Sequence, residues 1–456
     1  MSRRRALGGL LTVAALFGIV PASRATPAGS AASPSGAAAA RGSSLDIYYT
    51  SPVLARAGEQ VLMPVQVVCS TTDGRACAAR VTLGTHVPGE RWHLTRIQAT
   101  PGLGFDLSAP AARAAARGGF GTVEFFIRAE GPAGASVSIP PAGPQRPLSF
   151  AVTRGLPLVR IPGIVPSDVK GGRTVLSLPW GSGPMRAGLE PGRESAAAGP
   201  SSFDIDRSGR IYLVDPPQHR LAVFRAGKLV RSTRLDLGAD AAIAVTEEGT
   251  LAALDRSAGA LLARTLDASG ASERSAALGA GIVGQVRIVG GSAFGLVLPL
   301  DAWVALPGFD AATAAGTPAG SGPFAGEPLP SGGQLIRIAR QENVRLAIVT
   351  ATGMTNAVEL RTADRFGEVA LAEPDGGSGC WAVLHLWREL PNAADQYRVV
   401  HVVGGAITSS FAVANQAFAE TPPLSRFRLG GDGNLYQLVS SPSGMRIVRF
   451  DLKEGS

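Results

Sequence analysis

Six short triplets between residues 203 and 429 place one variable residue between two apolar ones. In a β-strand, successive side chains point to opposite faces, so the middle residue points away from its two apolar neighbours. Three middle residues are arginines and one is an aspartate, and a guanidinium binds a carboxylate or another anion through two hydrogen bonds. In the order of the chain, the middle residues are Asp204, Ala244, Arg287, Arg337, Ala370 and Arg428.

These residues would converge if their strands surrounded a common axis. Asp204, Arg287, Arg337 and Arg428 are therefore our candidate ligand-binding residues. Two interpretations stay open. The arginines either bind an anion or a carboxylate ligand in a narrow channel, or they pair with the aspartate, backbone carbonyls and water and so plug it.

The three cysteines predict one disulfide and one buried thiol. Cys69 and Cys77 flank the pair Asp73-Gly74, which is a strong turn signal, so the two thiols can face each other across a hairpin. An exported protein would oxidise them. Cys380 is left without a partner, and we expect a small buried thiol there rather than a nucleophile.

We expect no metal and no cofactor. The five histidines do not show ligand spacing, and a metal at Cys69 and Cys77 would need two further ligands. The segment 279–284 fits G-x-G-x-x-G by letter, but it lacks the preceding buried strand and the following helix that dinucleotide binding requires. The histidines are His86, His93, His219, His385 and His401.

The triplets belong to a longer repeat. Residues 200–221 follow the pattern P-x-x-Φ-x-Φ-D-x-x-G-x-Φ-Y-Φ-x-D and then H-R-Φ, where Φ is apolar, and residues 423–438 repeat its spacing. This run resembles one blade of an NHL-type β-propeller. Gly209 and Gly433 are 224 positions apart, which fits five intervals of about 45 residues. The resemblance therefore implies a six-bladed β-propeller over 173–456.

The ends of this propeller should close on each other. We expect residues 174–179 to supply the outer strand of the last blade, next to residues 445–451, because such closure removes exposed strand edges. The spacing between triplets is uneven, and the Ala/Gly/Pro-rich segment 310–333 is the expected insertion.

A second all-β domain precedes the propeller. Residues 45–154 contain about seven short alternating segments separated by Gly, Pro and Asp clusters, which is the pattern of an immunoglobulin-like β-sandwich. The Pro/Gly-rich segment 155–172 is predicted to be a linker that permits limited domain motion. The predicted fold class is all-β, an immunoglobulin-like sandwich followed by a six-bladed propeller.

The N-terminus predicts export. Three arginines precede a 15-residue apolar run, Ala6–Val20, and small residues follow it, as in a cleaved signal peptide over 1–25. The Ala/Gly/Ser/Pro-rich segment 26–44 is a predicted flexible linker. We expect a secreted or extracytoplasmic protein, exported by the Sec or the twin-arginine route, with no membrane span after the signal is removed.

The basic charge does not predict nucleic-acid binding. The formal net charge is +8, but Arg3, Arg4, Arg5 and Arg24 lie in the predicted signal peptide, which leaves 8 − 4 = +4. The other arginines are scattered and are not interleaved with aromatic residues that could stack on bases.

The sequence thus favours an exported monomeric binding protein. Both predicted domains are rigid platforms with variable loops, and the expected partner is an extracellular protein or glycan. Catalysis is not expected. The alternatives are a propeller-channel enzyme of the lyase or lactonase type and a structural component of the cell envelope, since a fold does not determine a function.

Overall fold

The structure is a computed structural model of the chain. It describes residues 44–71, 74–116, 118–145, 147–192, 196–239, 241–246, 251–255, 261–266, 272–278, 282–289, 292–298, 302–305, 324–329, 333–350, 353–421 and 425–452. The predicted signal peptide, the predicted 26–44 linker except its last residue, and most of the predicted insertion 310–333 lie outside these residues. Residues from Gly42 onward form one compact unit.

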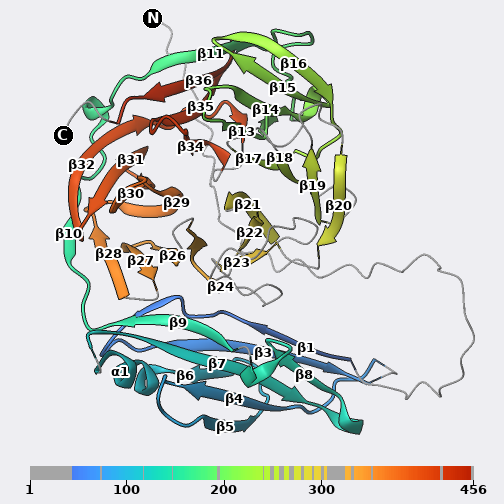
Figure 1. The fold of residues 1–456 in the computed structure, drawn as a ribbon, viewed down its shortest axis with the longest axis vertical. Helices are drawn as coiled ribbons and strands as arrows, with labels where there is room; N and C mark the ends of the chain where they lie inside the picture. Colours follow the sequence, from blue (N-terminus) through green and yellow to red (C-terminus); the bar gives the residue numbers. More distant parts are fainter. Residues whose placement is uncertain are drawn as a thin grey trace, which may run out of the picture. The chain divides into compact units, whose positions relative to one another are not determined.

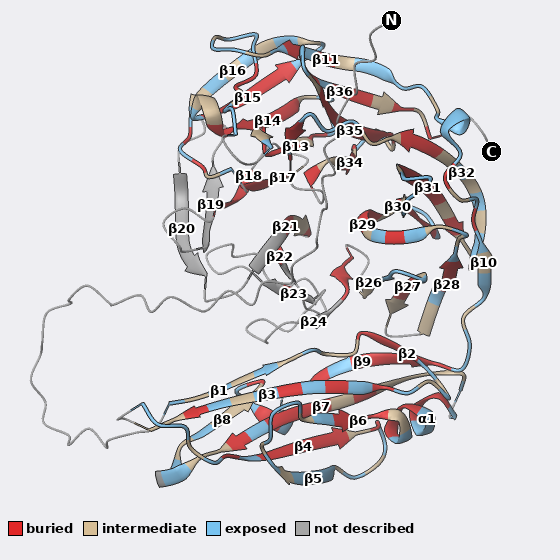
Figure 2. Ribbon diagram, turned by 180° about the vertical axis from the view of Figure 1, so that it is seen from behind, coloured by how far each residue is buried: buried red, intermediate tan, exposed pale blue. Residues whose placement is uncertain are grey.

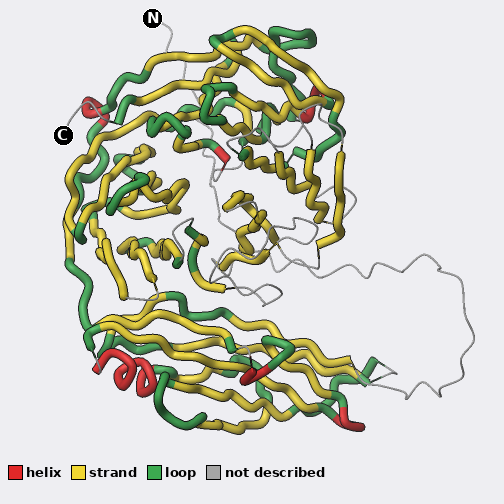
Figure 3. The backbone as a smooth tube through the Cα atoms, viewed as in Figure 1, coloured by secondary structure: helices red, strands yellow, loops and turns green. Residues whose placement is uncertain are grey.

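The described residues are almost entirely β-structure, with one α-helix (Figure 3). No described helix combines the length and the apolar character that a membrane crossing requires. The predicted all-β class is therefore confirmed.

Residues 44–153, called here the two-sheet segment, form two sheets around one apolar core (Figure 1). The strand orders are β1-β3-β6 and β2-β9-β7-β4-β5, and β8 also pairs with β7. Met63, Val81, Phe125 and Phe150 are buried in the core, where the strand alternation directs them. The bounds are β1 Ser44–Tyr49, β2 Leu54–Arg56, β3 Leu62–Ser70, β4 Arg80–His86, β5 His93–Gln98, β6 Gly104–Asp106, β7 Phe120–Glu130, β8 Ser136–Ile139 and β9 Leu148–Thr153.

Helix α1, Ser108–Ala116, was not expected from the sequence analysis, which ended a strand at Ser108. Six of its nine residues are alanines, and Pro110 lies in the first turn, where it is tolerated. The helix packs on β7 at Gly121, where an added Cβ would lie 2.3 Å from the Ala114 carbonyl oxygen. A glycine is thus required for this close approach.

The predicted disulfide is confirmed. Cys69 at the end of β3 is bonded to Cys77, and the backbone N–H of Cys77 donates to the Cys69 carbonyl at 3.1 Å. Gly74 has a φ of +81°, which suits the turn between them. Asp73 lies outside the described residues.

Residues 173–450, called here the sheet ring, contain six sheets in their described part (Figure 1). The strand orders are β13-β14-β15-β16, β17-β18-β19-β20, β21-β22-β23-β24, β25-β26-β27-β28-β10, β29-β30-β31-β32 and β34-β35-β36-β11. The bounds of the first three sheets are β13 Ser202–Ile205, β14 Ile211–Asp215, β15 Arg220–Arg225, β16 Lys228–Arg234, β17 Ala242–Val245, β18 Leu251–Asp255, β19 Leu261–Leu266, β20 Ser272–Leu278, β21 Ile282–Val289, β22 Ser292–Leu298, β23 Ala302–Ala305 and β24 Phe324–Ala325.

The other three sheets include both ends of the ring, and a short pair of strands lies apart. Their bounds are β10 Leu158–Arg160, β11 Arg173–Pro179, β25 Glu327–Pro328, β26 Gln334–Arg340, β27 Asn343–Thr350, β28 Gly353–Arg361, β29 Arg365–Pro374, β30 Gly379–Arg388, β31 Ala394–Val403, β32 Ala406–Ala414, β34 Phe427–Leu429, β35 Leu435–Ser441 and β36 Gly444–Phe450. The pair is β12 Ala197–Ala198 with β33 Ala419–Glu420.

The six sheets follow one another around an axis, as the blades of a β-propeller do. Strand β13 contacts β17 and β34, β17 contacts β21, β23 contacts β25, and β29 contacts β26 and β34. Each apolar triplet of the sequence lies in a different sheet, in β13, β17, β21, β26, β29 or β34. Figure 2 shows buried residues along strands of these sheets.

The predicted closure of the ring is confirmed. Strand β11 pairs antiparallel with β36, from Arg173 opposite Arg449 to Pro179 opposite Gly444. The first strand of the ring is therefore hydrogen-bonded to the last, which removes an exposed edge from each.

The segment 155–172 is fixed to the ring at several points rather than free. Strand β10 pairs parallel with β28, and Ile161 and Ile164 are buried. The Asp364 carboxylate accepts a hydrogen bond from the Ile164 N–H at 2.6 Å, and the Arg398 guanidinium donates to Asp168 at 2.9 Å. Its Pro/Gly composition suggested a hinge, but composition does not reveal such distant partners.

Candidate functional site

Four of the six middle residues come together at one cavity. Asp204, Ala244, Arg287 and Arg428 line a cavity of about 180 Å³, which we call the axial cavity. They come from β13, β17, β21 and β34, four strands of four different sheets. Glu373, near the end of β29, lines the same cavity.

The charges around the axial cavity pair with one another. Arg287 donates to Glu327 at 3.0 Å and also to Glu373. Asp204 accepts the backbone N–H groups of Ile205 and Val245, each at 2.8 Å. The arginine that the sequence offered for a ligand is thus held between two carboxylates.

Arg428 is 1% exposed and has partners on three strands. Its guanidinium donates to the Phe427 carbonyl at 2.8 Å and to the Ser202 hydroxyl at 3.4 Å, and its Nε lies 3.8 Å from Asp204 Oδ1. Charged groups in such a place are stable only when they are compensated, and this network compensates them.

Burial changes how these groups titrate. It raises the pKa of Glu373 to about 7, although Arg287 opposes the shift. Burial also raises the pKa of Asp204, and it lowers the pKa of Arg428 to about 10 with the help of the nearby Arg287 charge. The pKa of Arg287 is raised, because Glu373, Glu327 and Asp204 outweigh the effect of its burial. The cavity can therefore take up a proton close to neutral pH.

Arg337 and Ala370 do not line the axial cavity. Arg337 donates to the Gln285 side chain at 3.1 Å and lies over the Trp303 ring. Strand β25 precedes β26 in its sheet and supplies Glu327 to the cluster. At Ala370 the register shifts, because Val369 faces Leu384 and Leu371 faces Val383.

Sequence reasoning missed Glu327 and Glu373. A β-bulge adds one residue and so changes which side chains face inward, and this moves the polar position of β29 away from Ala370. Glu327 lies in a two-residue strand, which is too short to show alternation. We know of no pattern in the sequence that would have identified either residue.

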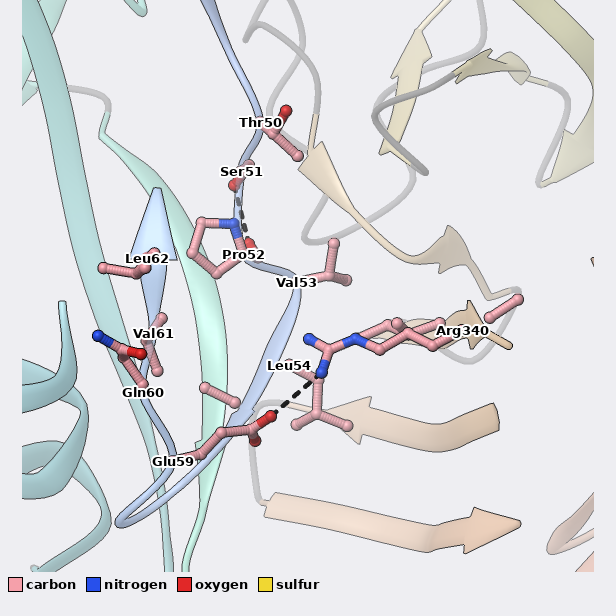
Figure 4. A pocket seen from close by; sticks show the side chains of 13 residues that line it. Thr50, Ser51, Pro52, Val53, Leu54, Glu59, Gln60, Val61, Leu62 and Arg340 are labelled. Atoms are coloured by element: carbon pink, nitrogen blue, oxygen red, sulfur yellow. Dashed lines mark hydrogen bonds and ion pairs between the residues drawn. The ribbon is translucent and has the colours of Figure 1, made fainter. Parts of the chain in front are cut away.

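A larger cleft of about 450 Å³ lies between the two-sheet segment and the sheet ring (Figure 4). Residues 50–55 and 59–62 form one wall, and Ile338, Ala339 and Arg340 form the other. We call it the junction cleft. Its volume is within the range of small-molecule and peptide pockets, which often lie between domains.

The two sides of the junction cleft are joined by apolar packing and by charge. Val53 and Leu54 pack with Ile336 and Ala347 in one buried cluster. Glu59 is hydrogen-bonded to two arginines of the ring, which are 281 and 286 positions away in the chain. Such a separation explains why the sequence analysis did not find this pair.

The charges at the cleft form a chain of five. Glu59 accepts from Arg345 at 2.8 and 3.1 Å and from Arg340 at 3.2 Å. Arg345 also donates to Glu359 at 3.1 Å, and Glu359 accepts from Arg361 at 2.7 and 3.0 Å. Burial alone would raise the pKa of Glu59, but the contacts with Arg345 and Arg340 lower it.

The histidines of the ring form separate ion pairs. His219 lies 3.1 Å from Asp236, His385 lies 2.6 Å from Asp395, and His401 lies 2.8 Å from Asp375. Within the described part of the chain, no three His, Cys, Asp or Glu side chains form a group that could hold a metal.

Cys380 is buried, and burial raises the pKa of its thiol to about 12. The fraction of reactive thiolate at neutral pH is therefore small. This agrees with the expectation of an unreactive buried thiol.

Comparison with known proteins gives a limited result. No family model and no curated protein matches the chain. Solved structures that resemble it include a virginiamycin B lyase from Staphylococcus aureus (7% identity, 59% of this chain and 99% of that one, TM-score 0.33) and a protein of unknown function from Bacteroides caccae (12% identity, 51% and 96%, TM-score 0.32).

A gluconolactonase from Xanthomonas campestris is a third (9% identity, 61% of this chain and 98% of that one, TM-score 0.26). The lyase and the gluconolactonase are β-propellers. At these identities and scores the likeness supports no statement about the activity of this chain.

Proposed function

We propose that the chain is an exported binding protein that holds its ligand in the junction cleft. In this proposal, residues 45–154 are an immunoglobulin-like sandwich and residues 173–456 are a six-bladed propeller of the NHL type. The disulfide between Cys69 and Cys77 is consistent with an extracytoplasmic location. The ligand is a segment of an extracellular protein or a glycan.

The junction cleft carries this proposal. It is larger than the axial cavity, about 450 Å³ against about 180 Å³. Its lining offers apolar surface at Val53 and Val61 and polar groups at Thr50, Ser51 and Gln60. A mainly apolar lining with a few polar groups is typical of ligand sites.

The test uses peptide and glycan arrays probed with the fluorescently labelled full chain. Gln60 is exposed and lines the cleft, so Gln60→Trp should occupy part of it without changing the charge. Val230→Trp is the matched control, because Val230 is 60% exposed and does not line the cleft. We expect array binding to be lost in the first variant and kept in the second.

Thermal melts of both variants must match the wild-type chain for the comparison to be valid. If compounds that bind the wild-type chain bind Gln60→Trp equally well, the junction cleft is not the binding site and the proposal is wrong.

A second candidate function is catalysis in the axial cavity by a lyase- or lactonase-type reaction. One observation favours it: Glu373 lines the cavity and has a pKa of about 7, so it is suited to accept or donate a proton at neutral pH. Hydrolysis or elimination of a lactone panel by the wild-type chain, abolished in Glu373→Gln, would establish this candidate. Equal rates in both proteins would exclude Glu373 as the catalytic acid or base.

A further inference from the structure

We propose that the junction cleft recognises an extended acidic peptide, whose carboxylate binds Arg340 while its apolar side chains lie against Val61 and Leu62. This proposal rests on the binding function proposed above. It specifies the class of ligand, and it is argued from charge, from the apolar lining and from the strand edge at the cleft.

The charge at the cleft is positive. The ion-pair chain holds two carboxylates, Glu59 and Glu359, and three guanidiniums. With all five groups ionised the chain therefore has a net charge of 3 − 2 = +1. A partner with a carboxylate is the simplest group to balance it.

Arg340 is the member of this chain that a ligand can reach. Its side chain is 52% exposed, whereas that of Arg345 is 4% exposed. The Arg340 guanidinium donates to Glu59 through one nitrogen, and a guanidinium has five N–H donors. The Glu59 oxygen that it contacts also accepts from Arg345. Figure 4 shows Arg340 reaching across the cleft to Glu59.

The cleft also has an apolar side. Val53 and Val61 are buried in its lining, and Leu62 is 54% exposed beside them. A purely polar ligand would leave this surface in water, and burial of a Val or Leu side chain stabilises a complex by about 1.5–3 kcal/mol. The ligand should therefore carry apolar groups next to its carboxylate.

The backbone along the cleft favours a peptide over a glycan. Strand β2 is the last strand in the order of its sheet, so no described strand pairs with its second edge. Leu54 and Ala55 of β2 line the cleft. An extended peptide can lie along such an edge, with alternate side chains turned toward the apolar wall.

The probe is a pool of fluorescein-labelled hexapeptides with Asp or Glu at two positions and Val, Leu or Ile at the others. Its neutral counterpart has Asn and Gln at the two acidic positions. Fluorescence polarisation with the full chain should show about tenfold or greater preference for the acidic pool, which is the effect expected of one charge-assisted hydrogen-bonded contact. The preference should fall as salt is raised.

Three variants locate the effect. Arg340→Ala should abolish the preference for the acidic pool, while Arg446→Ala should keep it, because Arg446 is also exposed, has one side-chain partner, Gln416, and does not line the cleft. Arg340→Lys should keep a weaker preference, since a lysine retains the charge but not the planar fork. Thermal melts verify that each variant is folded.

The outcomes separate this proposal from the one on which it rests. Equal binding of both pools, or a preference that survives Arg340→Ala, overturns the acidic-peptide proposal. Arg340-dependent binding of polygalacturonate without binding of either peptide pool overturns it in favour of an acidic glycan. If binding of any kind is lost in Gln60→Trp, the cleft remains the site; if all binding survives that change, the proposed function fails as well.

Discussion

Glu373 should make the stability of the sheet ring depend on pH, and Glu373→Gln should remove that dependence. The carboxyl lines the axial cavity beside Arg287, and burial raises its pKa from the usual 4.5 to about 7. The folded chain therefore keeps this proton to a higher pH than the unfolded chain does. Stability from this group is complete below pH 4.5 and is lost as pH rises through 7.

The size of the effect follows from the two pKa values. The full shift of 4.5 to about 7 corresponds to roughly 3.4 kcal/mol, and the part that falls between pH 5 and pH 8 is about 2.5 kcal/mol. The glutamine variant has no proton to lose at this position. Relative to the wild-type chain, Glu373→Gln should therefore gain about 2.5 kcal/mol between pH 5 and pH 8.

The assay is equilibrium urea denaturation followed by tryptophan fluorescence at several pH values. The pH-dependent difference is the relevant quantity, because it is independent of any constant cost of the substitution. Glu389→Gln is the control for removing a surface carboxylate, since the Glu389 side chain is 59% exposed. If the difference between Glu373→Gln and wild type stays constant from pH 5 to pH 8, the assignment of this buried carboxyl is refuted.

Three further predictions concern the other charged and covalent contacts. Arg428→Met should lower the free energy of unfolding by about 3–5 kcal/mol, because it leaves Asp204 buried without its guanidinium, and adding Asp204→Asn should restore part of the loss in urea denaturation. Cys69→Ser should cost about 2.5 kcal/mol through loss of a short disulfide loop, and reductant should lower the wild-type melting temperature but not that of the variant. The hydrogen bonds from His401 and two backbone N–H groups lower the pKa of Asp375 although burial opposes them, so Asp375→Asn should cost about 1.5–3 kcal/mol at pH 7. That cost should shrink in melts below pH 4, because this stabilisation is lost as pH falls through the folded-state pKa; a pH-independent cost would contradict it.

Local patterns predicted much of the fold. The apolar triplets marked one strand in each of six sheets, because strand alternation is set by neighbouring residues. The closing pair β11 and β36 followed from the need to cover two strand edges, and the disulfide followed from a turn signal between two cysteines.

The candidate sites depended on contacts that no local pattern encodes. The bulge at Ala370 displaced the polar position of β29 to Glu373, and a very short strand placed Glu327 against Arg287. The contact between Glu59 and Arg345 joins residues 286 positions apart. Each of these contacts is fixed by tertiary packing, and a single sequence does not reveal it.

Hydrogen exchange measured by mass spectrometry tests the central claim most directly. The full chain would be compared with and without the array compound that binds it most tightly. The account predicts slower exchange in peptides covering 50–62 and 338–340, with no change in those covering 202–207 and 427–431. Protection confined to the second pair of segments, which border the axial cavity, would contradict it.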